Sequence, residues 1–172
     1  MSIPDADAPL ETMWAGRFIK AERRGRWEFA GRTRGIRAAV ILAEHDGQVI
    51  LVEQYRVPLG RMSLELPAGL IGDDTAGEAI EAAATRELEE ETGYRAERIE
   101  IVGDFFASPG MLSESFTLVR AHGLTRVGAG GGVEGEAIMV HHVPRGEVAG
   151  FIAERRAAGV AMDVKLLALL TL

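Results

Sequence analysis

The sequence contains no cysteine, so neither disulfide bonds nor thiolate metal sites are available to it. It also lacks any apolar run of about 18 residues, the length that a membrane-spanning helix requires. The first residues, Met1 to Asp7, are acidic and do not show the basic-then-apolar order of a signal peptide. We therefore expect a cytoplasmic protein with no membrane partner.

Basic residues are also fewer than acidic residues. The chain carries 19 Lys and Arg against 26 Asp and Glu, which gives a formal net charge of −7. This balance argues against a nucleic-acid partner, because such partners are bound by neutralising their phosphates with Lys and Arg. A small anionic substrate remains compatible with the composition where metal ions reverse the local charge.

The chain length of 172 residues suits one domain with a proper core, and the pattern mixes strands with helices. We expect an N-terminal tail and β-hairpin over 1–35, with its turn around Arg23 to Gly25, followed by one domain over 36–172. The further predicted strands cover 36–43, 49–55, 64–66, 99–106, 115–121 and 137–143. The predicted helices cover 76–92, 146–157 and 162–170, the last of them largely buried. The fold class is α/β or α+β.

The helix over 76–92 carries clear signals at both ends. Thr75 is placed to be its N-cap, and Glu78, three residues on, would complete a capping box. Gly93 stands where a helix C-terminal glycine is expected.

Several glutamates of this helix must lie close together. Glu87 lies three and four residues before Glu90 and Glu91, and like charges at these spacings destabilise a helix by roughly 0.2–0.5 kcal/mol per pair. One explanation is an acidic face that water solvates. The other is a cation site, and oxygen ligands without Cys or His favour Mg²⁺ or Mn²⁺. Arg86 would then offset part of the charge and orient the carboxylates.

The wider spacing decides between these explanations. From Gly72 to Tyr94 the residues follow G-x5-E-x7-R-E-U-x-E-E-x-G-U, where U is bulky and apolar. At average residue frequencies, such a match arises by chance on the order of once in 10⁸ windows. The pattern resembles the Nudix box at every position.

The resemblance implies the Nudix fold, an α/β/α sandwich with a mixed sheet, and hydrolysis of a nucleoside diphosphate linked to another moiety. It implies Mg²⁺ as cofactor, with Mn²⁺ as a substitute. The implied metal ligands are Glu87, Glu90, Glu91 and the backbone carbonyl of Ala68, while Glu90 and Arg86 also belong to the implied catalytic set. Gly72 and Glu78 are then structural.

Three flanking segments, 54–56, 64–70 and 108–110, together resemble the ADP-ribose pyrophosphatase branch of this family. Pro109 lies sixteen residues after Gly93, a spacing associated with that branch. The resemblance implies conversion of ADP-ribose and water to AMP and ribose 5-phosphate. Hydrolysis of GDP-mannose or another nucleotide sugar is the alternative, and a module that binds ADP-ribose without hydrolysing it is less favoured because every box glutamate is kept.

The same resemblance implies a set of substrate contacts. Arg56 would clamp the diphosphate, because a guanidinium binds phosphate oxygens bidentately, although it could also be a surface arginine that closes a strand. The segment with Trp27, Glu28 and Arg32 resembles the one that grips adenine and ribose in dimeric relatives, where the N-terminal hairpin is exchanged between two copies. The remaining expected contacts are Trp14, Leu70 and Pro109. Either tryptophan could instead serve packing.

The catalytic base is expected on the glycine-rich segment before the last strand. Glu136 is the first candidate and Glu134 the second, with Glu114 after the proline loop as a third. Each of them could instead be an ordinary solvated loop residue. The segment 128–135 is too irregular for a phosphate-binding motif and is predicted to be a mobile loop near the site.

Overall fold

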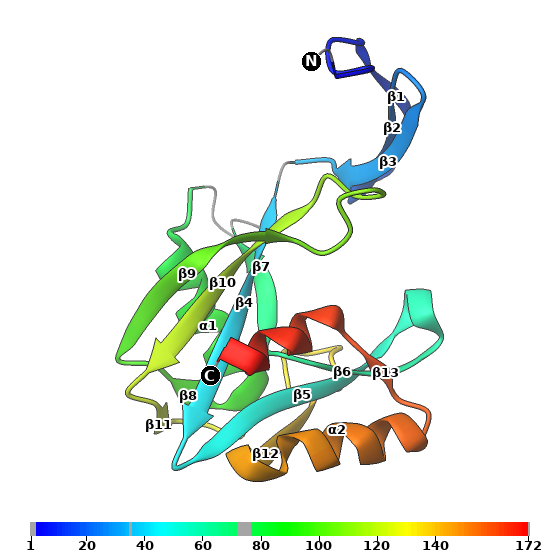
Figure 1. Cartoon of the computed structure of the whole chain (residues 1–172). Coiled ribbons are helices and arrows are strands. Elements are labelled where there is room, and N and C mark those ends of the chain that lie inside the picture. Colours follow the sequence, from blue (N-terminus) through cyan, green and yellow to red (C-terminus); the bar gives the residue numbers. More distant parts are fainter. Residues whose placement is uncertain (1–2, 35, 72–76, 172) are drawn as a thin grey trace.

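The computed structural model describes residues 3–34, 36–71 and 77–171. It consists of a body and an N-terminal extension that projects from it (Figure 1). The strands of the body are β4 (Arg37–His45), β5 (Gln48–Arg56), β6 (Arg61–Glu65), β7 (Ala68–Ile71), β8 (Tyr94–Arg95), β9 (Arg98–Phe106), β10 (Ser115–His122), β11 (Thr125–Arg126), β12 (Met139–Pro144) and β13 (Ala161–Met162). Its helices are α1 (Ile80–Thr92) and α2 (Val148–Ala157), with short 3-10 segments η1 (Val57–Leu59), η2 (Arg145–Glu147) and η3 (Val164–Thr171).

The main sheet is mixed. Its order is β13-β6-β5-β4-β10-β9, with β12 also paired to β5 and β7 also paired to β4. A tight turn at Asp46 and Gly47 joins β4 to β5, and both residues have the left-handed φ of a type I′ hairpin, 50° and 72°. The two strands pair beside this turn, where β12 already pairs with the other edge of β5. Further along, β4 pairs with β7 and β5 pairs with β6.

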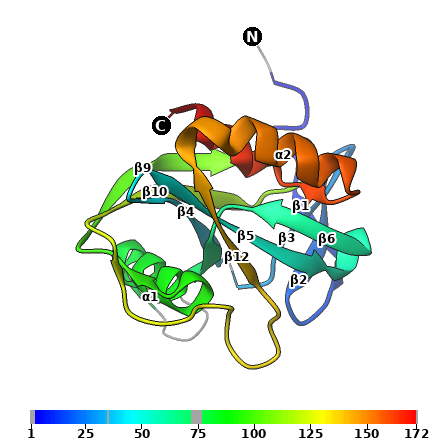
Figure 2. The same ribbon diagram turned by 90° about the horizontal axis from the view of Figure 1, so that it is seen from below.

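Strand β4 shows how the layers form, because its side chains alternate between two cores. Ala39 and Ile41 pack in the cluster that includes Ala84 and Leu88 of α1. Val40, between them, packs in the cluster on the opposite face, which α2 and η3 cover. Figure 2 shows α1 on one side of the strands and α2 on the other. The predicted α/β/α sandwich with a mixed sheet is confirmed.

Helix α1 begins later than its sequence predicts. Its N-cap is Ala79, with an extended backbone and no side-chain cap, so the predicted start at residue 76 is wrong. Thr75 lies outside the described residues. The predicted capping box with Glu78 therefore stays a prediction, and the Glu78 carboxylate pairs with Arg86 at 3.4 Å. The predicted glycine C-cap is confirmed, since Gly93 is left-handed and its amide donates to the Glu89 carbonyl at 2.9 Å.

The extension has one strand more than the predicted hairpin. It is an antiparallel sheet of β1 (Leu10–Ala15), β2 (Ile19–Arg24) and β3 (Trp27–Arg32). The reason is a first turn at residues 16–18, where the amide of Gly16 donates to the Ile19 carbonyl at 2.8 Å. The second turn falls at Gly25, just after the arginines that were expected within it.

The loop after β9 attaches this extension to the body. The amide of Ala30 donates to the Met111 carbonyl, and the amide of Ser113 donates to the Ala30 carbonyl, both at 2.9 Å. Arg32 at the end of β3 pairs with Glu114 at 2.7 Å. Backbone pairing and an ion pair therefore fix the extension beside the loop that contains Pro109.

The C-terminal part departs from its prediction. Residues 164–171 form the 3-10 segment η3, and the strand β13 precedes it, where a largely buried helix over 162–170 was expected. Leu166 is buried, whereas Leu167 and Leu170 are exposed, because η3 packs one side on the sheet. Helix α2 confirms the other predicted C-terminal helix. No helix in the described ranges has the length and apolar content to cross a membrane.

Candidate active site on helix α1

The buried stripe of α1 includes charged side chains. Ala83, Ala84 and Leu88 pack in the core, and the same face continues into Glu91, which is 5% exposed. One carboxylate oxygen of Glu91 accepts the backbone amide of Ala68, the first residue of β7, at 3.0 Å. Helix α1 therefore holds the Glu91 carboxylate in contact with the backbone of β7.

Glu87 makes an even closer approach to the same strand. A Cβ placed on Gly69 would lie 1.8 Å from the carboxyl carbon of Glu87. Any side chain at position 69 would therefore displace the Glu87 carboxylate from this place. Gly69 was not among the predicted site residues. A glycine inside a strand marks a close contact, and this was the available signal.

Arg86 lies at the centre of the remaining acidic groups. It pairs with Glu87 at 2.8 Å, with Glu90 at 3.2 Å and with Glu78 at 3.4 Å, and it donates to the Leu70 carbonyl at 3.4 Å. The partner carboxylates raise the pKa of Arg86 against the effect of its burial. Arg86 thus contacts both Glu87 and Glu90 and also connects α1 to β7, while its orienting role stays a prediction.

The two carboxylates that face β7 are costly to ionise. Burial raises the pKa of Glu91 to about 8, opposed by the Ala68 amide and reinforced by the charges of Glu87 and Glu136. Burial also raises the pKa of Glu87, and the ion pair with Arg86 partly offsets this effect. A bound cation would remove the penalty for both groups.

The donor set fits a hard divalent cation. The Glu87 and Glu91 carboxylates and the Ala68 carbonyl are oxygen ligands, which Mg²⁺ and Mn²⁺ prefer. Glu90 is turned toward Arg86, and its side chain is 35% exposed. Within the described ranges, no three His, Asp or Glu side chains are already arranged to hold a metal ion. Glutamate side chains on one helix face can reach this arrangement by rotamer changes, so the ligand set stays a prediction.

Arg56 is held by a buried carboxylate, although 43% of its own side chain is exposed. It ends β5 and forms two hydrogen bonds with the buried Glu65 of β6, at 2.8 and 2.6 Å. This contact raises the pKa of Arg56, and the charge of Glu91 adds to the effect. Glu65 was not predicted as a site residue, although an acidic residue between Leu64 and Leu66 is the kind of pattern that calls for a buried partner.

The structure separates the three base candidates. Glu136 accepts the Val133 amide at 3.1 Å, and its charge raises the pKa of both Glu87 and Glu91. Glu134 is exposed. Glu114 is occupied by its ion pair with Arg32. Glu136 is therefore the candidate with an electrostatic connection to the carboxylates of α1.

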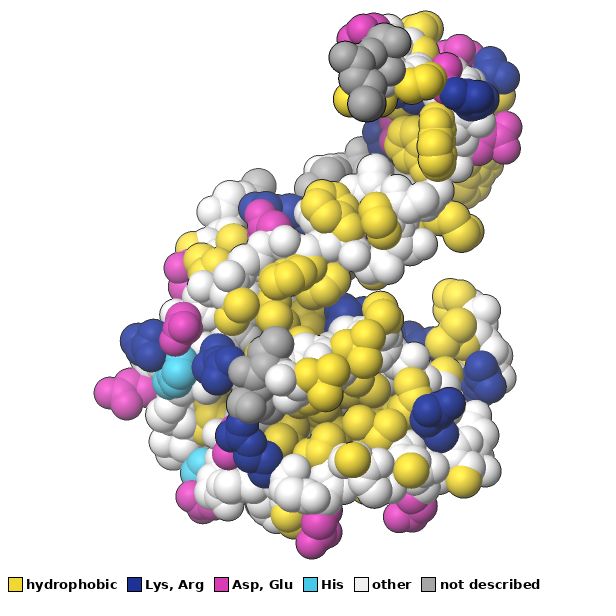
Figure 3. Space-filling model, viewed as in Figure 1, with side chains coloured by type: hydrophobic (Ala, Val, Ile, Leu, Met, Phe, Trp, Pro, Cys, Tyr) yellow, Lys and Arg dark blue, Asp and Glu magenta, His cyan; other side chains and the backbone are white. Residues whose placement is uncertain are grey.

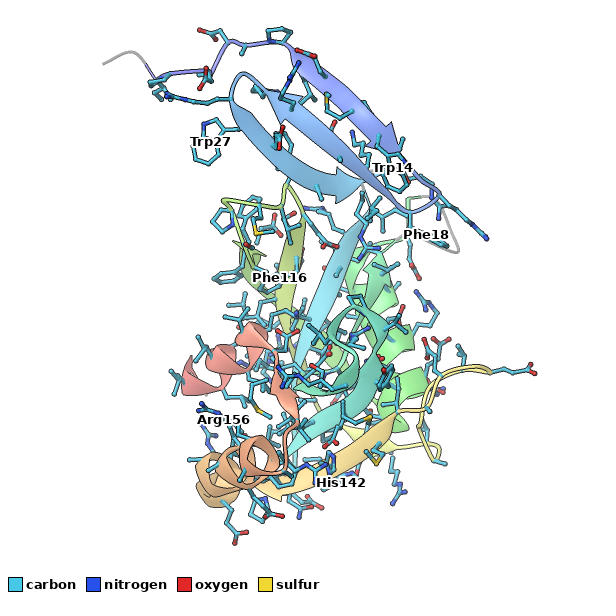
Figure 4. The ribbon with its side chains drawn as sticks, turned by 90° about the vertical axis from the view of Figure 1, so that its right-hand side faces the viewer. Trp14, Phe18, Trp27, Phe116, His142 and Arg156 are labelled. Carbon is cyan, nitrogen blue, oxygen red and sulfur yellow. The ribbon has the colours of Figure 1, made fainter. Side chains whose placement is uncertain are left out.

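The two tryptophans are both exposed, Trp14 at 57% and Trp27 at 55%. Trp27 pairs in register with Arg24, and Trp14 with Ala21. Because side chains alternate along a strand, residues three apart point to opposite faces. The tryptophans of one chain thus lie on opposite faces of the extension, and Figure 4 shows them at its two ends. One chain alone does not bring them together around a base.

A groove on the outer side of α1 was a second possible location for the site. It has a volume of about 710 Å³ and lies between the helix and the start of β9. Its walls include Arg86 and Glu90, but Glu87 and Glu91 are not among them. We place the site on the β7 side, because the buried carboxylates are directed there.

Comparison with known proteins identifies the family. Residues 33–155 match the NUDIX domain. The chain belongs to the Nudix family. In fold it is similar to a solved structure of an ADP compounds hydrolase, with a TM-score of 0.66 and 24% identity over 83% of this chain and 80% of the other.

Several known proteins are similar to this chain in sequence. A methanol dehydrogenase activator of Bacillus methanolicus is 37% identical over 69% of this chain and 63% of its own length. An ADP-ribose pyrophosphatase of Bacillus subtilis is 43% identical over 44% of this chain and 40% of its own. A GDP-mannose pyrophosphatase of Cronobacter sakazakii is 37% identical over 80% and 72%. The chain thus spans less than two thirds of the first two relatives and more of the third.

The Gly69 contact generates a direct test of the cation site. In Gly69→Ala the added methyl group displaces Glu87, so we expect the dissociation constant for Mn²⁺ to rise about tenfold or more. Electron paramagnetic resonance of free Mn²⁺ measures it. Gly146→Ala is the matched control, because a Cβ there meets no atom within 4 Å. Equal Mn²⁺ affinity in both variants and the wild type would contradict the site.

The raised pKa of Glu91 predicts how stability depends on pH when metal is absent. The folded state keeps a proton up to pH of about 8, whereas the unfolded chain releases it near its ordinary pKa of 4.5. Between these values the folded state binds more protons, so the free energy of unfolding falls as pH rises. We expect a loss on the order of a few kcal/mol, measured by urea unfolding in EDTA.

The neutral variant Glu91→Gln should flatten this dependence. Glu89→Gln is the control, because Glu89 is exposed and its pKa is lowered by Arg95 rather than raised by burial. A wild-type slope that Glu91→Gln leaves unchanged would show that Glu91 is not the group responsible.

Proposed function

We propose that this chain is a pyrophosphohydrolase that cleaves the diphosphate of ADP-ribose, or of a related nucleoside diphosphate sugar, with Mg²⁺ or Mn²⁺. The observation that carries the proposal is the pair of carboxylates, Glu87 and Glu91, pressed against β7 with raised pKa values in a chain of the Nudix family. The names of the similar ADP-ribose and GDP-mannose pyrophosphatases support the substrate class.

The reaction needs few groups of the chain. Water supplies an oxygen to one phosphorus, the bond from that phosphorus to the bridging oxygen breaks, and ADP-ribose yields AMP and ribose 5-phosphate. Glu136 would accept the proton that the water loses, which suits its position near the carboxylates of α1. Arg86 keeps Glu87 and Glu90 oriented, and Arg56 would hold a phosphate, with Glu65 fixing its guanidinium.

A divalent cation held by Glu87, Glu91 and the Ala68 carbonyl, with Glu90 joining when it leaves Arg86, would neutralise charge on the diphosphate and make water a better nucleophile. The acidic chain needs such a cation to admit an anionic substrate, because its formal charge is −7.

We also propose that the base of the substrate binds to the extension, residues 1–35, while residues 36–172 carry the hydrolysis. Figure 3 shows the surface hollowed between the extension and the η1 end of the body. Arg56 stands directly before η1. Trp27, Glu28 and Trp14 are exposed on the extension, while Leu70 and Pro109 remain predicted contacts.

The opposite orientation of the tryptophans favours a homodimer. A stacked base needs two facing aromatic rings, and Trp14 and Trp27 of one chain point to different faces. A second copy that places its extension across the first would supply the missing ring. The exposed apolar side chains of the extension, among them Phe18 and Ile19, would be covered in the same dimer.

Activity on ADP-ribose tests the proposed function. With Mg²⁺ we expect AMP and ribose 5-phosphate as products, and chromatography measures them. Glu91→Gln should lower kcat by about a hundredfold or more, because it removes a carboxylate that would hold the cation. Glu89→Gln should keep wild-type activity, since its carboxylate pairs with Arg95 away from β7.

A panel that includes GDP-mannose, ranked by kcat/KM, distinguishes the two substrates, because this ratio reports specificity. If no nucleotide sugar is cleaved with either metal, the proposed function is wrong. If GDP-mannose leads the ranking, only the choice of sugar and base changes.

Subunit mixing tests the exchanged extension. We expect a dimer by light scattering, and low activity for Trp14→Ala, Trp27→Ala and Glu91→Gln measured alone. If a site combines one tryptophan of each copy, mixing Glu91→Gln with one of the tryptophan variants restores activity and mixing it with the other does not. A monomer, or no restoration in either mixture, would contradict the exchange.

A further inference from the structure

The glycine-rich segment between β11 and β12, residues 127–138, is bound to the end of α1. Four of its amides donate to carbonyl oxygens there: Val127 and Gly128 to Gly93 at 2.8 and 3.1 Å, Gly131 to Glu91 at 2.8 Å, and Gly132 to Glu90 at 3.0 Å. Carbonyls in the last turn of a helix lack partners within it, and this loop supplies them. The sequence predicted a mobile segment, whereas these contacts hold it against the helix.

The approach of the loop to the helix requires glycine. Gly130 has a left-handed φ of 70°, and a Cβ on it would lie 2.4 Å from the carbonyl carbon of Thr92. Gly93 faces it with φ of 76°, and a Cβ there would lie 2.4 Å from the Gly128 carbonyl oxygen. Both obstacles are backbone atoms, which cannot turn aside as a side chain can.

The same loop carries Glu136. The Glu136 carboxylate accepts the Val133 amide at 3.1 Å, and it lies close enough to Gly132 that a Cβ there would be 2.6 Å from it. The carbonyl of Gly131 accepts the amide of Ile138 at 3.2 Å, just before β12 begins. Gly131 therefore connects the helix on one side with the end of the loop on the other.

The far end of the loop is fixed as well. Met139, the first residue of β12, pairs with the fully buried Glu53 of β5. Glu53 forms two hydrogen bonds with Arg155 of α2, at 2.9 and 2.5 Å, and a third contact with His141 of β12 at 3.1 Å. This buried cluster holds β12 where the loop enters it.

We propose that Gly130, Gly131 and Gly132 are positioning residues that set the distance between Glu136 and the carboxylates of α1. The proposal rests on the proposed function, in which Glu136 accepts the proton. The backbone carbonyls of Glu90 and Glu91 hold the loop, while the side chains of these residues belong to the site. One short stretch of backbone thus fixes the proton acceptor relative to the groups that would hold the cation.

Two glycine variants isolate this role. Gly130 and Gly135 both have left-handed φ, 70° and 95°, so alanine at either position strains the backbone. Only at Gly130 does the added methyl group meet α1, because a Cβ on Gly135 has no atom within 4 Å. We expect Gly130→Ala to lower kcat about tenfold or more with KM changed less than about twofold. Gly135→Ala should keep both within about twofold to threefold.

Gly132→Ala provides a milder variant in case Gly130→Ala does not fold. Its methyl group would meet the Glu136 carboxylate, which is the end of a flexible side chain and can move aside. We expect it to fold and to lower kcat. When Glu136→Gln is already present, Gly130→Ala and Gly132→Ala should lower kcat little further. The effects of residues that act through one group are not additive. Fully additive losses would overturn the proposal.

Two measurements do not depend on turnover. Gly130→Ala should accelerate hydrogen exchange at the Gly131 and Gly132 amides, and it should weaken the Mn²⁺-induced relaxation of the Val133 amide, which reports the distance from loop to cation. Gly135→Ala should change neither. Unchanged exchange and relaxation in Gly130→Ala would overturn the proposal. If Mn²⁺ relaxes the Val133 amide of the wild type and Gly130→Ala weakens this relaxation, but the wild type cleaves no nucleotide sugar, the proposed function alone is rejected.

Discussion

The packing of Glu87 and Glu91 against the backbone of β7 is the constraint on which the rest of the site depends. Two carboxylates on one helix face repel each other, and burial makes their ionised forms costly, so the arrangement opposes folding unless something compensates. Arg86 offsets part of this cost by its ion pair with Glu87, and the Ala68 amide offsets another part by its hydrogen bond to Glu91. A divalent cation bound as proposed would offset the remaining penalty.

Neighbouring elements of the fold hold both β7 and α1, and so fix the positions of Glu87 and Glu91. β7 presents Gly69 to Glu87 because β4, at the centre of the sheet, fixes its register. The glycine-rich segment holds the end of α1, and β12 holds the end of that segment. Catalytic groups of phosphoryl transfer must be positioned closely, since positioning and charge stabilisation supply most of the rate. The extension offers exposed aromatic rings, which the proposed dimer would cover.

The sequence predicted that the carboxylates of α1 lie close together, because helical spacing alone brings Glu87 near Glu90 and Glu91. The uninterrupted apolar run of β4, from Ala38 to Ala43, is typical of a strand that is buried on both faces. The start of α1 at Ile80 was missed because Glu78 suggested an earlier cap, whereas the N-cap of the helix is Ala79 with an extended backbone. The contact of Gly69 with Glu87 joins separate segments, so a glycine within a strand could signal a close approach but not which side chain makes it. The same holds for the fork between Arg56 and Glu65, whose partners meet only when the strands pair.

Anomalous diffraction from crystals grown with Mn²⁺ tests the central claim most directly. The account predicts a manganese peak between the carboxylates of Glu87 and Glu91, beside the Ala68 carbonyl, with Arg86 still bound to the Leu70 carbonyl. Manganese bound on the outer side of α1, in the groove between Glu89 and Glu97, would contradict it. So would a crystal in which both carboxylates keep their present contacts and no manganese lies beside them.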